Sequence, residues 1–150
     1  MAKNMIQGNE IVPCPYVLLS EEDTPSGASN EALPLEGFLA WAENDNSGER
    51  GVIIEPGETV DSLQPLLHRA SYVAISFPKF SDGRGYSHAR RLRKNLEYKG
   101  PIVSFGDVLR DQLMHMKRCG ISAFIMRDDQ DLSASLEVFE RFPTYYQKAL

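Results

Sequence analysis

Residues 72 to 97 read YVAISFPKFSDGRGYSHARRLRKNLE, in which a strand, a turn and a helix follow one another. The β-branched and aromatic residues of Tyr72–Phe77 predict a strand, and Pro78 ends it because proline cannot donate to a sheet ladder. Apolar residues at spacings of three and four then predict an amphipathic helix from about Gly85 to Glu97. This strand, loop and helix set the pattern for most of the chain.

Similar units alternate from Gly51 onward, and the four predicted strands are Val52–Glu55, Tyr72–Phe77, Ile102–Phe105 and Ser122–Met126. Pro65 interrupts the first helix, Asp107 is expected to N-cap a third helix that ends at Arg118, and the fourth helix begins near Asp131. This alternation predicts four right-handed βα units and an α/β fold with a mainly parallel sheet. An open three-layer sheet and a partial (βα) barrel both satisfy the order.

The N-terminal part of the chain differs from this pattern. Ile6–Val17 reads as two short extended pieces around Gly8-Asn9, which predicts a hairpin or an edge arm. Residues 20–30 string together acidic residues, Ser, Gly and Pro, as a linker does. A short amphipathic helix is expected next. We therefore expect one domain of 150 residues, with an arm and linker over 1–34 and a βα core over 35–150.

The overall composition narrows the classes of function. The net charge of −5 argues against broad binding to nucleic acid or membrane surfaces. No apolar run approaches the roughly 20 residues that span a bilayer, and no secretory signal precedes the domain, so a cytoplasmic protein is expected. Cys14 and Cys119 lie far apart, without the spacing of a zinc or iron–sulfur site. We expect reduced thiols, no metal and no cofactor.

One short segment is basic within this acidic chain. Six basic residues and one acidic residue lie between Lys79 and Lys94. Glycines permit tight turns there, and the start of the following helix exposes N–H groups with a partial positive charge. Arg84, His88 and Arg91 fall at i, i+4 and i+7, on one stripe of that helix. The pattern predicts a site for a small oxyanion or anionic metabolite, such as sulfite, sulfate, phosphate or a carboxylate.

Simpler roles are open for several of these residues. A dinucleotide-binding fingerprint is incomplete because His88 stands where its third glycine belongs. Asp82 either belongs to the site or caps the turn or pairs with an arginine. Gln112 falls near an apolar stripe, where its amide needs partners. Arg90, Arg93 and Lys94 are expected on a solvated face. The candidate ligand-binding residues are Lys79, Asp82, Gly83, Arg84, Gly85, His88, Arg91 and Asp107.

The carboxyl ends of parallel strands carry the functional groups in both candidate architectures. In this chain those ends are followed by Glu55-Pro56, Pro78–Arg84, Gly106-Asp107 and Arg127-Asp128. We therefore expect polar groups from four separate segments to converge on one rim.

Two long motifs carry a resemblance to a known family. FPKFSDGRGYSHARRLR from Phe77 and GDVLRDQL from Gly106, followed by Arg118-Cys-Gly, resemble the bacterial domain family DUF934. The resemblance covers about residues 35 to 147. Members of that family are described as oxidoreductases of sulfite reduction, because they accompany sulfite reductase in bacterial genomes.

The resemblance implies an accessory or catalytic protein of assimilatory sulfite or sulfate reduction, with an anionic ligand at Lys79–Arg91. The alternative is a non-catalytic interaction protein that docks a sulfite reductase or its electron donor. Whether the protein is an enzyme stays open, since no flavin, nicotinamide or haem motif is visible. Exposed sheet edges would also permit a homodimer.

Overall fold

The computed structural model describes residues 3–44 and 47–140 and contains one eight-stranded sheet, in the order β2-β1-β8-β7-β6-β5-β4-β3. The strands are β1 (Asn4–Gln7), β2 (Glu10–Pro13), β3 (Val17–Leu18), β4 (Glu31–Pro34), β5 (Arg50–Ile54), β6 (Ala70–Phe77), β7 (Ile102–Gly106) and β8 (Ala123–Phe124). The helices are α1 (Leu35–Asn44), α2 (Arg84–Lys94), α3 (Leu113–Arg118), α4 (Leu132–Glu140) and the 3-10 segments η1 (Val60–Arg69) and η2 (Arg110–Gln112).

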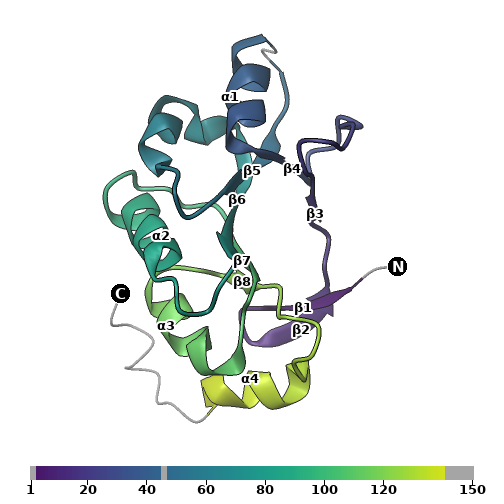
Figure 1. The fold of residues 1–150 in the computed structure, drawn as a ribbon, viewed down its shortest axis with the longest axis vertical. Helices are drawn as coiled ribbons and strands as arrows, with labels where there is room; N and C mark the ends of the chain where they lie inside the picture. The colour runs from purple at the N-terminus through teal and green to yellow at the C-terminus, as the bar shows by residue number, and fades with distance from the viewer. Residues whose placement is uncertain (1–2, 45–46, 141–150) are drawn as a thin grey trace.

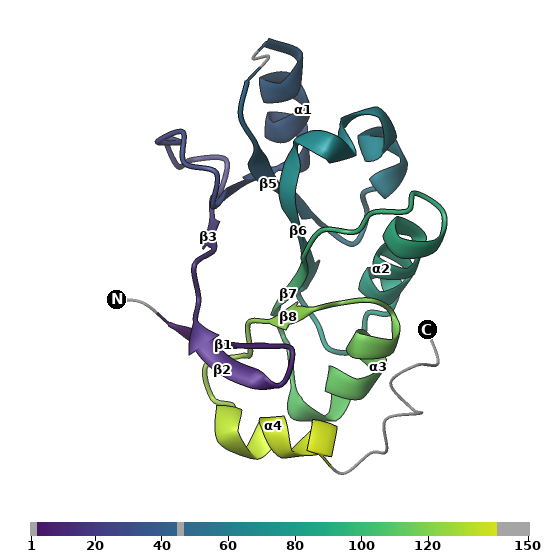
Figure 2. The same cartoon turned by 180° about the vertical axis from the view of Figure 1, so that it is seen from behind.

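The strand order decides between the two predicted architectures. Strands β3 to β8 are sequential neighbours and all pair in parallel, while the β1–β2 hairpin adds antiparallel strands beside β8. An order without reversal is that of a (βα) barrel, whereas a doubly wound sheet reverses at a switch point. The sheet curls, and α1, η1, α2 and α3 lie on its outer side (Figures 1 and 2). The α/β prediction is confirmed, with the partial barrel as its form.

The sequence analysis missed the strand β4. This strand lies inside the predicted arm and linker of residues 1–34 and pairs with β5 through Ala32, Leu33 and Pro34. Helix α1 therefore follows a parallel strand and completes a fifth βα unit, beyond the four that were predicted. Only four residues form β4, and they include Glu31 and a proline, so the strand has too little apolar pattern to be recognised.

The outer face of the sheet and the helices enclose the larger part of the core. Ile54, Val73 and Ile75 of the central strands are fully buried there, together with Leu92 of α2 and Leu113 of α3. Burying each of these side chains contributes about 1.5 to 3 kcal/mol. This packing fixes the helices on the strands and hence positions the loops at the strand ends. In the described part of the chain, no helix has the length and apolar character needed to cross a membrane.

A second cluster lies on the inner face of the curl, on the side of the sheet away from α1, η1, α2 and α3. Alternate residues of the chain from β2 to β3 pack on this face, where they meet Tyr72 and its neighbours; they are Val12, Cys14, Tyr16 and Leu18. The rings of Tyr16 and Tyr72 lie 4.2 Å apart, and Tyr72 Oη donates to Asn30 O at 2.6 Å. The residues between them, Pro13, Pro15 and Val17, are exposed. The segment that joins the two edge strands thus covers the inner face.

The start of the third helix differs from what was predicted. Asp107 does not cap the third helix, because the chain first turns through η2 and α3 begins only at Leu113. Pro65 lies within η1, which is a 3-10 segment capped by the Thr59 side chain. The fourth helix begins as predicted, and Asp131 Oδ1 accepts from Ala134 N at 3.1 Å.

Candidate functional site

Three loops at the carboxyl ends of β6, β7 and β8 are joined through one carboxylate. Asp107 Oδ2 accepts from the backbone N–H of Phe80 at 2.9 Å, and Asp107 Oδ1 accepts from Arg127 Nη1 at 2.7 Å. The loop after β5 also reaches this rim, since His88 Nε2 lies 3.3 Å from Pro56 O. Three of the four segments predicted to converge therefore meet by hydrogen bonds, and the fourth contacts α2. Asp107 acts there as the link between loops.

Arg127 is the central cation of the rim. Its Nε and Nη2 atoms donate to the two carboxylate oxygens of Asp129 at 2.7 and 2.8 Å, while Nη1 donates to Asp107. These hydrogen bonds lower the pKa of Asp129 to about 2, and the Arg127 hydrogen bond also lowers the pKa of Asp107. Both carboxylates are therefore ionised at neutral pH. Neither has the raised pKa that a general acid or base near pH 7 requires.

The loop after β6 is tied to the η2 segment on its other side. Gln112 Nε2 donates to Phe80 O at 2.8 Å, and Gln112 Oε1 accepts from Leu109 N at 3.2 Å. The predicted need of this amide for partners is thereby met. The ring of Phe80 itself is 57% exposed.

The start of α2 holds a carboxylate of its own. Asp82 Oδ1 accepts from the backbone N–H of Arg84 at 3.1 Å, and Asp82 Oδ2 accepts from Arg84 Nη2 at 2.7 Å. The Arg84 side chain and its backbone N–H lower the pKa of Asp82 to about 2. Of the roles considered for Asp82, the cap of the turn and the pair with an arginine are both observed. This carboxylate lies where the predicted oxyanion would be.

The remaining residues of the predicted stripe also have partners within the chain. Arg91 forms an ion pair with Asp61 of η1, and this contact lowers the pKa of Asp61. His88 faces the carbonyl of Pro56. Lys79 is exposed on the loop before α2. The stripe of cations is therefore present, but two of its arginines already face carboxylates.

The two glycines of the motif have different roles. A Cβ on Gly85 would lie 2.5 Å from the ring of Phe77, so glycine there allows α2 to approach β6. A Cβ on Gly83 would meet nothing within 4 Å. Neither glycine has a positive φ. Close packing, and not a tight turn, is what requires Gly85.

Arg93 contradicts the prediction of a solvated face. Its side chain is half-buried and donates to three carbonyls, those of Tyr98 at 2.9 Å, Gly100 at 2.6 Å and Gly120 at 3.0 Å. Burial lowers the pKa of its guanidinium. Arg90 and Lys94 are exposed, as predicted. The helical period could not identify Arg93 as buried, because its partners are backbone groups that any residue carries.

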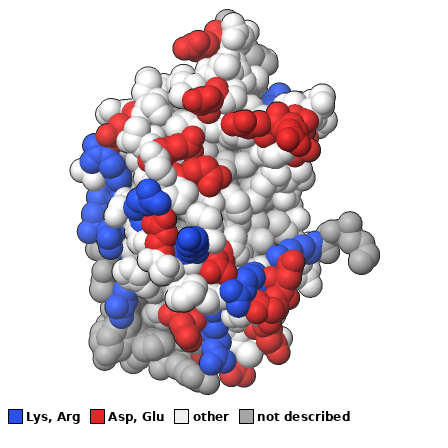
Figure 3. Space-filling model, in the orientation of Figure 1, with Lys and Arg blue, Asp and Glu red and all other residues white. Residues whose placement is uncertain are grey.

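Charge is distributed unevenly over the surface. Lys and Arg side chains gather along the edge of the molecule where α2 lies, whereas acidic side chains dominate the end around α1 (Figure 3). Helix α2 contains no acidic residue. Within the described residues, no group of three His, Cys, Asp or Glu side chains is arranged to hold a metal ion.

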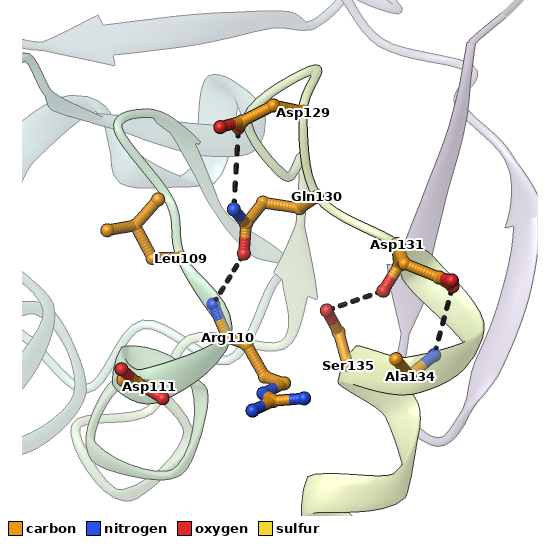
Figure 4. Close-up of a pocket in the computed structure, with 8 residues that line it drawn as sticks. All are labelled: Leu109, Arg110, Asp111, Asp129, Gln130, Asp131, Ala134 and Ser135. Atoms are coloured by element: carbon orange, nitrogen blue, oxygen red, sulfur yellow. Dashed lines mark hydrogen bonds between the residues drawn. The ribbon is translucent and has the colours of Figure 1, made fainter.

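A pocket of about 270 Å³ lies beside the rim, between η2 and the start of α4 (Figure 4). Polar side chains line it together with Leu109 and Ala134, and Gln130 bridges the pocket by accepting from Arg110 N and donating to Asp129. Its three carboxylates are those of Asp111, Asp129 and Asp131. This pocket was not anticipated from the sequence.

The rim loops lie in a part of the chain that matches a known protein family. The family model described as a bacterial protein of unknown function, DUF934, matches residues 51–150. The chain belongs to this family. The match begins at residue 51 and not at 35, so β5 to α4 and all the rim loops lie within the DUF934 region, while β1 to β4 and α1 precede it. A search of the curated proteins finds no match to the chain.

Within this DUF934 protein, sequence reasoning overlooked the central position of Arg127 and the exposure of Phe80. The run Arg127-Asp128-Asp129 after β8 was a usable signal, because opposite charges at a strand end often pair across neighbouring loops. The exposure of Phe80 had no signal, since an aromatic residue three positions after the end of a buried strand is equally compatible with the core.

Proposed function

We propose that this DUF934 protein is a cytoplasmic accessory protein of assimilatory sulfite reduction that docks an acidic surface of the sulfite reductase or of its electron donor. The observation that carries the proposal is the basic outer face of α2. Arg84, Arg90, Arg91 and Lys94 are exposed on a helix without acidic residues, although the whole chain has a net charge of −5. Such local reversal of charge speeds and orients association with an oppositely charged protein.

The chemistry of the rim favours docking over catalysis. Asp107 and Asp129 have lowered pKa values because both are hydrogen-bonded to Arg127, so they are poor proton acceptors at neutral pH. The link to sulfite reduction rests on the family resemblance of the two long motifs. The link to docking rests on the charges alone, and the two parts of the proposal can be tested separately.

The pathway is tested by growth of a deletion strain. Loss of the protein should impair growth on sulfate or sulfite and spare growth on sulfide or cysteine, because sulfide and cysteine enter below the reductase. Equal growth on all four sulfur sources, in a strain without a second copy of the gene, would remove the pathway from the proposal.

Docking is tested by titrating the protein with purified sulfite reductase and, separately, with its electron donor. Binding to one of them should weaken as salt rises, because exposed charges are screened. Arg90→Glu should also weaken binding at a constant salt concentration. Lys3→Glu is the control for the same change in net charge, since Lys3 lies on the approach to β1, where it contacts Met126 O and Asp128 and not α2. If neither salt nor Arg90→Glu changes the affinity, the basic outer face of α2 is not the docking surface.

The second candidate function is binding of a small oxyanion at the start of α2. It is favoured by one observation, namely that Gly83 at the N-cap supplies no side-chain hydrogen bond to the helix. The anion would have to compete with Asp82 for Arg84. Asp82→Asn should therefore strengthen the binding of sulfite or sulfate in a calorimetric titration. Absence of binding to both wild type and Asp82→Asn would exclude this site.

A further inference from the structure

Among the described residues, Phe80 has the most exposed of the large apolar side chains. Its exposed fraction of 57% exceeds those of Val17 and Ile11, which are 43% and 36%. Three residues earlier, Phe77 is 1% exposed and packs on the ring of Tyr86 at 5.2 Å. Two phenylalanines at one strand end thus have opposite environments. Leaving one in water forgoes about 1.5 to 3 kcal/mol of burial, so its position needs an explanation.

The explanation lies in the backbone of Phe80, which is held on both sides. Its N–H donates to Asp107 and its carbonyl accepts from Gln112, and both side chains come from the segment after β7. Asp107 is in turn fixed by Arg127 and by its own N–H, which donates to Phe77 O at 2.6 Å. These hydrogen bonds fix the backbone of Phe80 and hence the direction in which its Cα–Cβ bond leaves the loop. The exposure of Phe80 is therefore built into the rim.

A restrained, exposed aromatic ring is suited to binding. An aromatic residue contributes a large contact area, and a backbone that is already ordered loses little entropy when the complex forms. The surroundings of the ring indicate the partner's chemistry. Lys79 precedes Phe80, and the basic outer face of α2 follows it. An apolar ring beside cations fits an apolar pocket whose border is acidic.

We propose that Phe80 is the aromatic anchor of the docking surface, and that its partner is a folded protein with an apolar pocket bordered by carboxylates. This inference rests on the proposed docking function and extends it, because the charges of α2 alone identify neither the residue that anchors the partner nor the pocket that receives it. Asp107, Gln112 and Arg127 are positioning residues, since they act on the partner through the backbone of Phe80.

The anchor is tested by the affinity of Phe80→Ala for the reductase and for its electron donor, each purified. The affinity should fall about tenfold or more, as it does for central aromatic residues of interfaces, while the thermal midpoint stays at the wild-type value. Val17→Ala is the matched control, because it removes another exposed apolar side chain from the edge strand β3, which β4 and β5 separate from β6. It should bind as wild type does.

The role of Asp107 is tested by a pair of variants. Asp107→Ala should weaken binding and speed hydrogen exchange of the Phe80 amide. Asp107→Asn keeps an oxygen that can accept from that amide, so it should retain more of the affinity and more of the protection from exchange. A purely structural role would lower the thermal midpoint of both variants in proportion to their loss of binding. Slow exchange and full affinity in Asp107→Ala would overturn the positioning role.

The outcomes separate this inference from the docking face. If Phe80→Ala binds as wild type does while Arg90→Glu binds weakly, the anchor is wrong and the basic face stands. If Phe80→Ala loses binding while salt and Arg90→Glu have no effect, the anchor stands and the basic face is wrong. If neither protein binds wild type, both proposals fail. Binding of a short DNA duplex with the same dependence on Phe80 would overturn the assignment of a protein partner.

Discussion

The two ends of α2 carry the same kind of side chain in opposite roles. Arg84 at the start has a side chain that is 63% exposed and pairs with Asp82, two residues before it in the same loop. Arg93 near the end is half-buried and donates to carbonyls of Tyr98, Gly100 and Gly120, which lie outside the helix. The comparison shows that the contribution of an arginine to stability depends on whether its hydrogen-bond partners can be solvated by water when the arginine is removed. A carboxylate in water recovers its solvation, whereas a covered carbonyl does not.

The largest effect is expected for Arg93→Ala. The substitution leaves three carbonyls without their donor and opens space beside Gly120, where the Arg93 side chain packs. The free energy of unfolding should fall by about 2 to 3 kcal/mol, measured by urea denaturation. A variant that unfolds at the wild-type urea concentration would remove the contrast between the two arginines.

A smaller effect should separate the two glycines that flank Arg84. Gly85→Ala places a Cβ against the ring of Phe77 and should cost about 1 to 3 kcal/mol of stability, as overpacking does. Gly83→Ala meets no neighbouring atom and should change stability by less than about 0.5 kcal/mol. Thermal melts of both variants provide the measurement. Equal melting temperatures would contradict the close packing of α2 on β6.

The smallest effect on stability is expected at the exposed end of α2. Arg84→Ala should lower the free energy of unfolding at neutral pH by less than Arg93→Ala does, because the Arg84 side chain is 63% exposed and its partner is one solvent-screened carboxylate. Since the folded-state pKa of Asp82 is lowered to about 2, its share of stability is present above its ordinary pKa and is lost as pH falls from about 4 to about 2. Arg84→Ala should therefore flatten the acid limb of the stability profile, and an unchanged limb would argue against the ion pair.

The sequence predicted the architecture better than it predicted individual contacts. Strands and helices bury one face, so apolar residues recur in the sequence with the period of the strand or of the helix. This period can be recognised from the sequence alone. The contacts of Asp107 and Arg93 leave no such period. Asp107 has the residue type of an N-cap but bonds to Phe80 and Arg127 instead. Arg93 lies among charged neighbours but faces two carbonyls that follow the helix and a third, that of Gly120, from a distant segment.

The same reasoning accounts for the part of the sheet that was missed. β4 has four residues and β3 only two, so neither shows the alternation that identifies a strand. Each is held by its neighbour in the sheet, through pairs such as Ala32 with Gly51. The choice of a partial barrel depended on these pairings, which require knowledge of the adjacent strand.

The inner face of the curled sheet has a consequence for how the chain reaches its native state. Its apolar cluster is shared between Ile53, Tyr72, Val103 and Ala123 of the DUF934 region and residues that precede that region, among them Met5, Tyr16 and Ala32. Residues 51–150 alone would leave this face in water. We therefore expect the N-terminal segment and the DUF934 region to unfold together, although the family match begins only at residue 51.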